Sequence, residues 1–202
     1  MEPNSDAVVY IVDDDDGGRA SLQYLIESIG LKTQSFANPS AFLAQFDAEA
    51  IGCIVLDMRL PGASGLELLR ELKQRTAEMP VTMISAYANV QDAVKATKSG
   101  AYDFFEKPLN DQGILDCVQQ SIVDHRAIRV VEKKRGEIQT CFASLTERER
   151  EVLDLMIEGE RNKEIAQLMR ISTKTVEAYR ASMMKKMQTP SVAQLVTLSQ
   201  AG

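Results

Sequence analysis

The 202-residue chain has little of what several classes of protein require. Its longest uninterrupted apolar run, residues 7–12, is far too short to cross a membrane. The first six residues are polar and acidic, so we expect no secretory signal. Three cysteines are an odd number without the spacing of metal ligands, which fits a reducing cytoplasm. One histidine, His125, cannot build a His-rich metal site, and we expect it to be a solvated helix residue.

The charge is divided unevenly along the chain. Residues 1–124 contain 9 Lys and Arg against 19 Asp and Glu, whereas residues 125–202 contain 14 against 10. The first part is therefore strongly acidic, and the second is basic enough to suit a polyanion. This split suggests two domains with different partners, although ordinary surface variation alone is an equal alternative.

The first 120 residues alternate between two hydrophobic patterns. Short strand-like runs cover residues 8–12, 32–36, 53–56, 81–85 and 102–105. Apolar stripes at helical spacing lie at residues 22–29, 90–97 and 114–122. Strands that alternate with helices predict a doubly wound, five-stranded parallel sheet. The first and third runs are apolar throughout, as buried parallel strands are.

A charged segment follows, and the alternation stops. Its apolar residues Ile128, Val131, Ile138 and Phe142 fit one helical stripe, which Gly136 interrupts. We interpret residues 124–144 as a helical linker, either a solvated spacer or a helix that pairs with its copy in a dimer. The predicted domains are residues 1–123, this linker and residues 145–202.

The last part of the chain has a wholly helical pattern. Thr146 and Glu149 form a capping box at the start of a helix that Gly159 ends. Later helices are expected at residues 163–169 (burying Ile165, Leu168 and Met169), from the cap Ser172 to about 186 (burying Val176, Met183 and Met187), and from Pro190 (containing Leu195, Val196 and Leu198). Together they predict a compact all-α module.

Acidic and other polar residues stand where the predicted strands end. Asp13 and Asp14 follow the first strand, Asp57 follows the third, Ser85 ends the fourth and Lys107 follows the fifth. The carboxyl ends of parallel strands meet at one edge of a sheet, where ligands bind. We therefore expect three carboxylates, a hydroxyl and an ammonium group to converge there.

This combination suits Mg²⁺ and a phosphoryl group. Clustered carboxylates repel one another unless a cation lies among them, and Mg²⁺ favours carboxylates together with water and phosphate oxygens. Aspartate is a covalent phosphoryl acceptor in several enzyme mechanisms. A lysine and a hydroxyl beside it would hold the phosphoryl oxygens.

The same residues resemble the receiver domain of bacterial response regulators. The resemblance covers residues 7–123 and rests on Val12-Asp13-Asp14-Asp15, Leu56-Asp57-Met58-Arg59-Leu60-Pro61-Gly62, Ser85-Ala86 and Asp103-Phe104-Phe105-Glu106-Lys107-Pro108. One departure is Gly17-Gly18, where the family usually carries a bulkier residue at the entry to the first helix.

The resemblance implies a role for each of these residues. Asp57 is the expected phosphoryl acceptor, and Lys107 and Ser85 the residues that contact the phosphoryl group. Mg²⁺ would be bound by Asp13, Asp14, Asp57 and the backbone carbonyl of Arg59. Ser85 and Phe104 would form the switch that favours a dimer through the fourth helix, fifth strand and fifth helix. The alternative for Phe104 is a plain core aromatic. The Lys107–Pro108 bond is expected to be cis.

The C-terminal segment resembles the helix-turn-helix of LuxR/NarL/FixJ regulators, within which the receiver favours the FixJ-like subgroup. The resemblance rests on Leu145-Thr146-Glu147-Arg148-Glu149-Arg150-Glu151-Val152-Leu153, Asn162-Lys163-Glu164-Ile165-Ala166 and Ile171-Ser172-Thr173-Lys174-Thr175-Val176-Glu177. It implies that the third helix of the module enters the major groove of double-stranded DNA. The candidate DNA contacts are Lys163, Lys174, Thr175, Glu177, Ala178, Arg180, Ala181 and Lys185.

Together the two resemblances imply a two-component transcription regulator of the bacterial cytoplasm, with no membrane segment and no enzymatic activity of its own. A sensor histidine kinase would phosphorylate Asp57, the chain would dimerise on DNA, and RNA polymerase would be the downstream partner. One alternative is a regulator whose receiver-like domain works without phosphorylation. A haloacid-dehalogenase phosphatase is disfavoured, because a motif begun at Asp13 or Asp14 closes on Gly17 or Gly18 instead of the required Thr or Val.

Overall fold

The computed structural model describes residues 6–75, 78–87 and 89–187. The chain divides into two compact units, residues 1–130 and 131–202, each with its own hydrophobic core.

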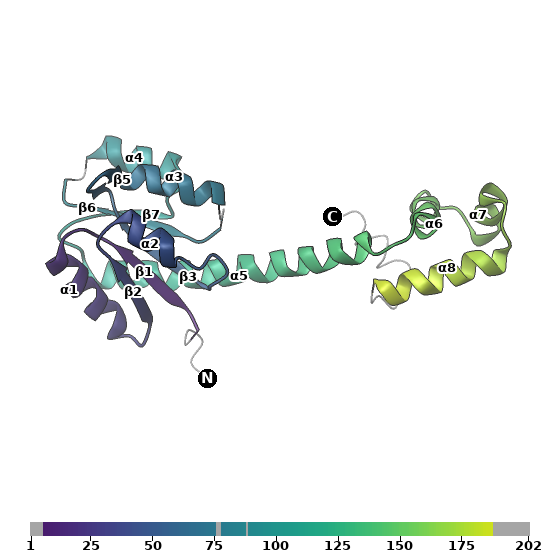
Figure 1. The fold of residues 1–202 in the computed structure, drawn as a ribbon, viewed down its shortest axis with the longest axis horizontal. Coiled ribbons are helices and arrows are strands. Elements are labelled where there is room, and N and C mark those ends of the chain that lie inside the picture. The colour runs from purple at the N-terminus through teal and green to yellow at the C-terminus, as the bar shows by residue number, and fades with distance from the viewer. Residues whose placement is uncertain (1–5, 76–77, 88, 188–202) are drawn as a thin grey trace. The chain divides into compact units, whose positions relative to one another are not determined.

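The first unit is built on a five-stranded parallel sheet (Figure 1). Its strands are β1 (Val8–Val12), β2 (Lys32–Phe36), β3 (Gly52–Asp57), β6 (Val81–Ser85) and β7 (Asp103–Glu106). Their order in the sheet is β2-β1-β3-β6-β7, the doubly wound order in which ligands bind where the winding reverses, between β1 and β3. The predicted fold class is confirmed, with the fifth strand one residue later than predicted.

Burial on both faces explains the composition of the central strands. Every residue of β3 and β6 is buried, and four of the five residues of β1 are. Helices α1 (Asp16–Glu27) and α5 (Asp111–Ala143) cover one face of the sheet. Helices α2 (Pro39–Gln45), α3 (Gly65–Arg75) and α4 (Val90–Lys98) cover the other.

Helices α2 and α3 and a small hairpin lie outside the apolar stripes that the sequence pattern indicated. Helix α2 begins with Pro39 after the cap Asn38, whose side chain accepts a hydrogen bond from the backbone of Ala41. Between β3 and α3, strands β4 (Arg59–Leu60) and β5 (Ala63–Ser64) form a two-residue antiparallel ladder. This hairpin directly follows Asp57.

The predicted stripe at residues 90–97 is not a core face. Val90 and Val94 are 82% and 44% exposed, and the buried residue of α4 is Ala96. The helix that this stripe predicted is confirmed as α4. Helical spacing shows that apolar residues share a face, but not which face the sheet covers.

The expected interruption at Gly136 is absent, since α5 runs through it to Ala143. A glycine inside a helix costs about 1 kcal/mol relative to alanine, which is too little to end a helix that continues on both sides. The segment expected to be a helical linker is therefore the C-terminal part of α5, apart from its last residue.

His125 is also not the solvated residue that we expected. It is 1% exposed, and its Nδ1 lies 2.9 Å from the carbonyl oxygen of Gly52. Burial lowers the pKa of His125, because the charged imidazolium would lose its hydration. The helix still packs on the sheet at this residue, which the charged sequence around it concealed.

The second unit contains α6 (Glu147–Ile157), α7 (Asn162–Met169) and α8 (Thr173–Lys186) (Figure 1). The predicted capping box of Thr146 and Glu149 is confirmed, as is the burial of Val176, Met183 and Met187. Ile165 is buried as expected, but Leu168, which we also expected to be buried, is 61% exposed; the second buried residue of α7 is Ala166. The helix predicted from Pro190 lies outside the described residues.

Candidate functional site

The strand order brings the predicted acidic residues together. Val12 of β1 is paired with Leu56 of β3, so Asp13 follows β1 beside the end of β3, where Asp57 stands. Carboxylate oxygens of Asp13, Asp14 and Asp57 all lie within 4.8 Å of one another. Asp13 and Asp57 are 1% and 6% exposed, whereas Asp14 is exposed.

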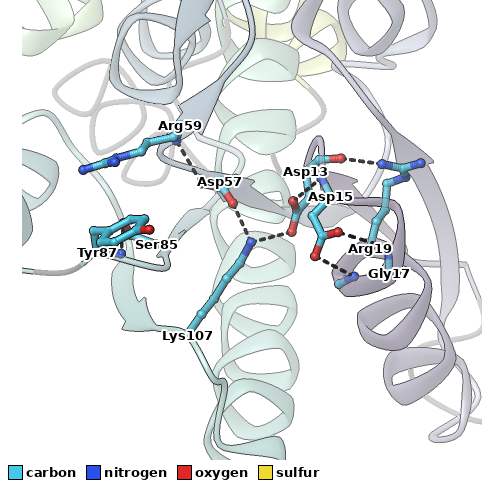
Figure 2. Close-up of polar contacts among 10 residues, drawn as sticks. Asp13, Asp15, Gly17, Arg19, Asp57, Arg59, Ser85, Tyr87 and Lys107 are labelled. Carbon is cyan, nitrogen blue, oxygen red and sulfur yellow. Dashed lines mark hydrogen bonds and ion pairs between the residues drawn. The ribbon is translucent and has the colours of Figure 1, made fainter.

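Lys107 bridges the two buried carboxylates (Figure 2). Its Nζ lies 2.8 Å from Asp13 Oδ2 and 2.5 Å from Asp57 Oδ2. Partial burial on its own would lower the pKa of Lys107, but its hydrogen bonds to Asp13 and Asp57 outweigh burial and raise the pKa. The ammonium is thus charged at neutral pH. The Lys107–Pro108 bond is cis, as expected.

The other oxygen of Asp57 is held by the hairpin that follows it. Asp57 Oδ1 accepts a hydrogen bond of 2.8 Å from the backbone N–H of Arg59. Gly65 closes the loop, and its N–H donates to Met58 at 2.9 Å. A Cβ at Gly65 would lie 2.1 Å from the Asp57 carbonyl oxygen, so only glycine allows this close approach.

Ser85 lies buried at the end of β6, and its Oγ accepts a hydrogen bond of 3.3 Å from the backbone of Tyr87. The Tyr87 ring is exposed and stacks with the Arg59 guanidinium, whose Cζ lies 4.6 Å from the ring centroid (Figure 2). Phe104 is half-buried and packs against the core under α2, α3 and α4. The residues expected to form a switch therefore lie on the neighbouring strands β6 and β7.

The acidic cluster fits Mg²⁺ by the chemistry of its donors. Three carboxylates this close repel one another strongly, and Lys107 supplies only one positive charge. A small divalent cation that keeps several waters suits a shallow site with one exposed and two buried carboxylates. The Arg59 carbonyl as a further ligand stays a prediction.

The second unit exposes one face of α8 while the other face packs in the core. Five of the candidate DNA contacts on α8 are exposed: Lys174, Glu177, Ala178, Ala181 and Lys185. Helix α8 begins at the cap Ser172, whose Oγ accepts from the backbone of Thr175 at 3.1 Å. The face thus starts from a capped N-terminus, where a recognition helix presents its first residues to base edges.

The remaining candidate DNA contacts lie around this face. Lys163 is exposed on α7. Arg180 is partly buried and donates a short hydrogen bond to Asn162 Oδ1 on α7, which fixes its guanidinium. The hydroxyl of Thr175 contacts the Ser172 hydroxyl at 2.8 Å.

Comparison with known families supports both halves of this description. Residues 9–119 match the response regulator receiver domain, and residues 143–199 match the bacterial regulatory proteins of the luxR family. The chain is 42% identical over 191 residues to the transcriptional regulatory protein FixJ of Azorhizobium caulinodans, which covers 95% of this chain and 90% of that protein. It is 35% identical over 197 residues to the response regulator protein TmoT of Ectopseudomonas mendocina, covering 98% and 90%.

This chain is a FixJ/NarL-type response regulator.

Solved structures agree with this assignment. The response regulator StyR has a TM-score of 0.91 at 36% identity, covering 98% of this chain and 100% of that one. Full-length FixJ from B. japonicum has a TM-score of 0.57 at 36% identity, covering 96% and 95%. The protein is thus a two-component transcription regulator, and its family is not one of enzymes. Among the helices described, none is both long and apolar enough to cross a membrane.

Sequence reasoning missed the contacts of two polar residues beside Asp13 in this response regulator. Asp15 caps α1 by accepting from the backbones of Gly17 and Gly18. Arg19 donates from Nη1 to the Asp13 carbonyl oxygen at 2.6 Å (Figure 2). The contact between Arg19 and Asp16 could have been predicted, because side chains three residues apart on a helix are neighbours. The bond to the Asp13 carbonyl has no such sequence signature.

Proposed function

We propose that this regulator accepts a phosphoryl group on Asp57 from a sensor histidine kinase and then binds promoter DNA as a homodimer. Mg²⁺ would be held by Asp13, Asp14, Asp57 and the Arg59 carbonyl. The observation that carries the proposal is a cluster of three carboxylates, two of which share the charged ammonium of Lys107. An ordinary core would not gather these groups at one sheet edge, because burying them costs free energy.

The chemistry is the transfer of a phosphoryl group from nitrogen to oxygen. A carboxylate oxygen of Asp57 attacks phosphorus, the new P–O bond forms, and the P–N bond of the phosphohistidine breaks. The electron pair of that bond stays on the departing imidazole. Mg²⁺ supplies neutralising charge for the phosphoryl oxygens when it is bound. Lys107 then exchanges its contact with Asp57 for a phosphoryl oxygen, and the Arg59 N–H keeps the acceptor oriented.

An apolar cavity of about 430 Å³ beside the acceptor suits the approach of the donor protein. It lies between α1 and the segment after β7, with Asp13 and Lys107 in its lining. Tyr24, which also lines it, is 78% exposed. We infer that the helix carrying the phosphohistidine packs here.

Ser85 and Phe104 would convert phosphorylation into a change of surface. The Ser85 hydroxyl would leave its contact with the Tyr87 N–H and donate to a phosphoryl oxygen. Phe104 on the neighbouring strand would then turn further inward. Val90 and Val94 of α4 are exposed and would lie in the surface through which the chain dimerises.

The DNA complex would use α8 as the recognition helix. Lys163, Lys174 and Lys185 suit phosphate contacts, which position a protein on DNA but do not specify sequence. Candidate contacts within the groove are Thr175, Glu177, Ala178, Arg180 and Ala181. A carboxylate such as Glu177 can accept from the amino group of cytosine. The two recognition helices of a dimer would bind a two-fold-related DNA site. RNA polymerase would be the downstream partner of the bound dimer.

The proposal includes the division into a receiver (residues 1–123), a helical linker (124–144) and a DNA-binding domain (145–202). It also places the protein in the bacterial cytoplasm, where the kinase domain, Mg²⁺ and DNA are all accessible.

The test is phosphoryl incorporation followed by DNA binding. The full chain is incubated with a small acyl phosphate and Mg²⁺, and its intact mass is measured for wild type, Asp57→Asn and the control Asp116→Asn on the exposed face of α5. We expect one added phosphoryl group in wild type and in Asp116→Asn, but none in Asp57→Asn or without Mg²⁺. Phosphorylation should also tighten binding to promoter DNA. Equal DNA affinity with and without the phosphoryl group would favour the phosphorylation-independent alternative.

A further inference from the structure

Arg19, in the first turn of α1, contacts the turn that carries the acidic residues. Its Nη1 donates to the Asp13 carbonyl oxygen at 2.6 Å (Figure 2). Its Nη2 contacts Asp16 Oδ1. Its backbone N–H donates to the Asp15 carbonyl at 2.9 Å. The Arg19 side chain is only 17% exposed. One side chain thus ties the end of β1 to the start of α1.

The segment that Arg19 spans contains two consecutive glycines. Gly17 and Gly18 occupy the first turn of α1, and glycine loses more conformational freedom on folding than any other residue. Without side chains they add no packing that would hold the turn. The restraints on this turn include the Asp15 cap, the contacts of Arg19 and the ion pair of Asp13 with Lys107.

The position of this turn matters because it carries two of the three clustered carboxylates. Asp13 Oδ1 accepts from the Asp15 N–H at 3.0 Å, so the carboxylate and the turn are held as one unit. Repulsion among Asp13, Asp14 and Asp57 tends to push this turn away from β3. A bond to the Asp13 carbonyl opposes that movement.

We propose that Arg19 is a positioning residue for the Mg²⁺ site. Its contacts restrain the turn of residues 13–16, which the flexible Gly17-Gly18 segment would otherwise leave free to move. This inference rests on the proposed function, since it concerns the same acidic site. Groups that orient metal ligands commonly change metal affinity by 10- to 100-fold when they are removed.

A purely electrostatic role of Arg19 predicts the opposite sign. The positive charge of Arg19 lies against the turn that carries Asp13 and Asp14 and disfavours a divalent cation there. Its removal would therefore strengthen Mg²⁺ binding if charge were its only contribution. Loss of positioning would weaken binding. The direction of the change therefore separates the two roles.

The experiment is calorimetric titration of the full chain with Mg²⁺, together with its thermal unfolding. The variants are Arg19→Gln, Arg19→Lys and the control Arg126→Gln, which loses an ion pair with Asp6 at the opposite edge of the sheet. We expect Mg²⁺ binding to weaken about tenfold in Arg19→Gln. Arg19→Lys should fall between it and wild type, because one ammonium lacks the planar fork that reaches both acceptors. Arg126→Gln should bind as wild type does.

A second substitution tests the role of the glycines. A Cβ at Gly17 would lie 3.8 Å from Asp15 Oδ1, an ordinary contact, whereas a Cβ at Gly18 would lie 2.8 Å from Asp15 Oδ2. Gly17→Ala should therefore stiffen the turn and restore part of the Mg²⁺ affinity of Arg19→Gln, and Gly18→Ala should not. If Arg19 only stabilised the fold elsewhere, Gly17→Ala would not restore the Mg²⁺ affinity that Arg19→Gln loses.

Each result decides the inference. Unchanged or tighter Mg²⁺ binding in Arg19→Gln overturns it, as does equal weakening in Arg126→Gln or failure of Gly17→Ala to restore affinity. If wild type itself bound no Mg²⁺ and accepted no phosphoryl group, the proposed function would fail along with it. If wild type did both and Arg19→Gln matched it, only the role of Arg19 would be wrong.

Discussion

Glu149 of α6 offers a quantitative test of how the second unit is held together. It is 3% exposed, and its carboxylate accepts hydrogen bonds from Lys186 Nζ at 2.7 Å, Ser182 Oγ at 2.6 Å and the Thr146 N–H at 2.8 Å. Burial alone would raise its pKa, but these bonds outweigh burial and lower the pKa to about 2. One buried carboxylate therefore caps α6 and joins it to α8.

The size of the effect follows from the pKa. Each pKa unit is worth about 1.4 kcal/mol, so a fall from 4.5 to about 2 corresponds to about 3 kcal/mol of stability at neutral pH. The unfolded chain takes up this proton first, so the contribution is full above about pH 4.5. It is lost as the pH falls toward 2.

Substitution of Glu149 tests the stabilising contribution of its charge. Glu149→Gln keeps an acceptor but removes the charge, and a hydrogen bond to a charged group is worth about 1.5–3 kcal/mol. We expect the second unit of the full chain to lose about 2 kcal/mol, measured as the opening free energy of α6 and α8 amides by hydrogen exchange. The control Glu151→Gln, which breaks the exposed pair with Arg148, should change it by less than about 0.5 kcal/mol. A loss of less than about 0.5 kcal/mol in Glu149→Gln would refute the reasoning.

The structure makes three further predictions. Gly52→Ala places a Cβ 1.9 Å from the Val8 carbonyl oxygen, so the backbone must shift; we expect a loss of at least about 2 kcal/mol by denaturant unfolding, and an unchanged midpoint would contradict this. Because burial lowers the pKa of His125, the unfolded state takes up this proton first, and stability should fall as the pH drops below about 6.5. His125→Gln should flatten that fall, and an equal fall in both proteins would count against it. Lys174→Ala or Lys185→Ala should weaken DNA binding and reduce its salt dependence by about one counterion; unchanged affinity in gel-shift titrations would show that this face of α8 does not contact DNA.

Much of the receiver could be predicted because its sheet is parallel and buried. A strand covered on both faces must be apolar throughout, so β1 and β3 were evident from composition. The acidic residues could be placed together because strand ends converge, and the distances among Asp13, Asp57 and Lys107 confirm that convergence.

The errors came from tertiary packing, which local pattern does not contain. Apolar spacing alone did not show that Val90 and Val94 of α4 and Leu168 of α7 face outward. His125 stands among charged residues, but the contact that buries it is with Gly52, 73 residues away in the sequence. The bond of Arg19 to the Asp13 carbonyl also has no local sequence signature.

The central claim is that the phosphoryl group on Asp57 controls assembly. The direct measurement is the molar mass of the full chain by light scattering in Mg²⁺, with and without a small phosphodonor, for wild type and Asp57→Asn. We predict that donor doubles the mass of wild type and leaves that of Asp57→Asn unchanged. A molar mass that is the same with and without donor, and the same in wild type and Asp57→Asn, would contradict this claim. The receiver would then be a constitutive interaction module.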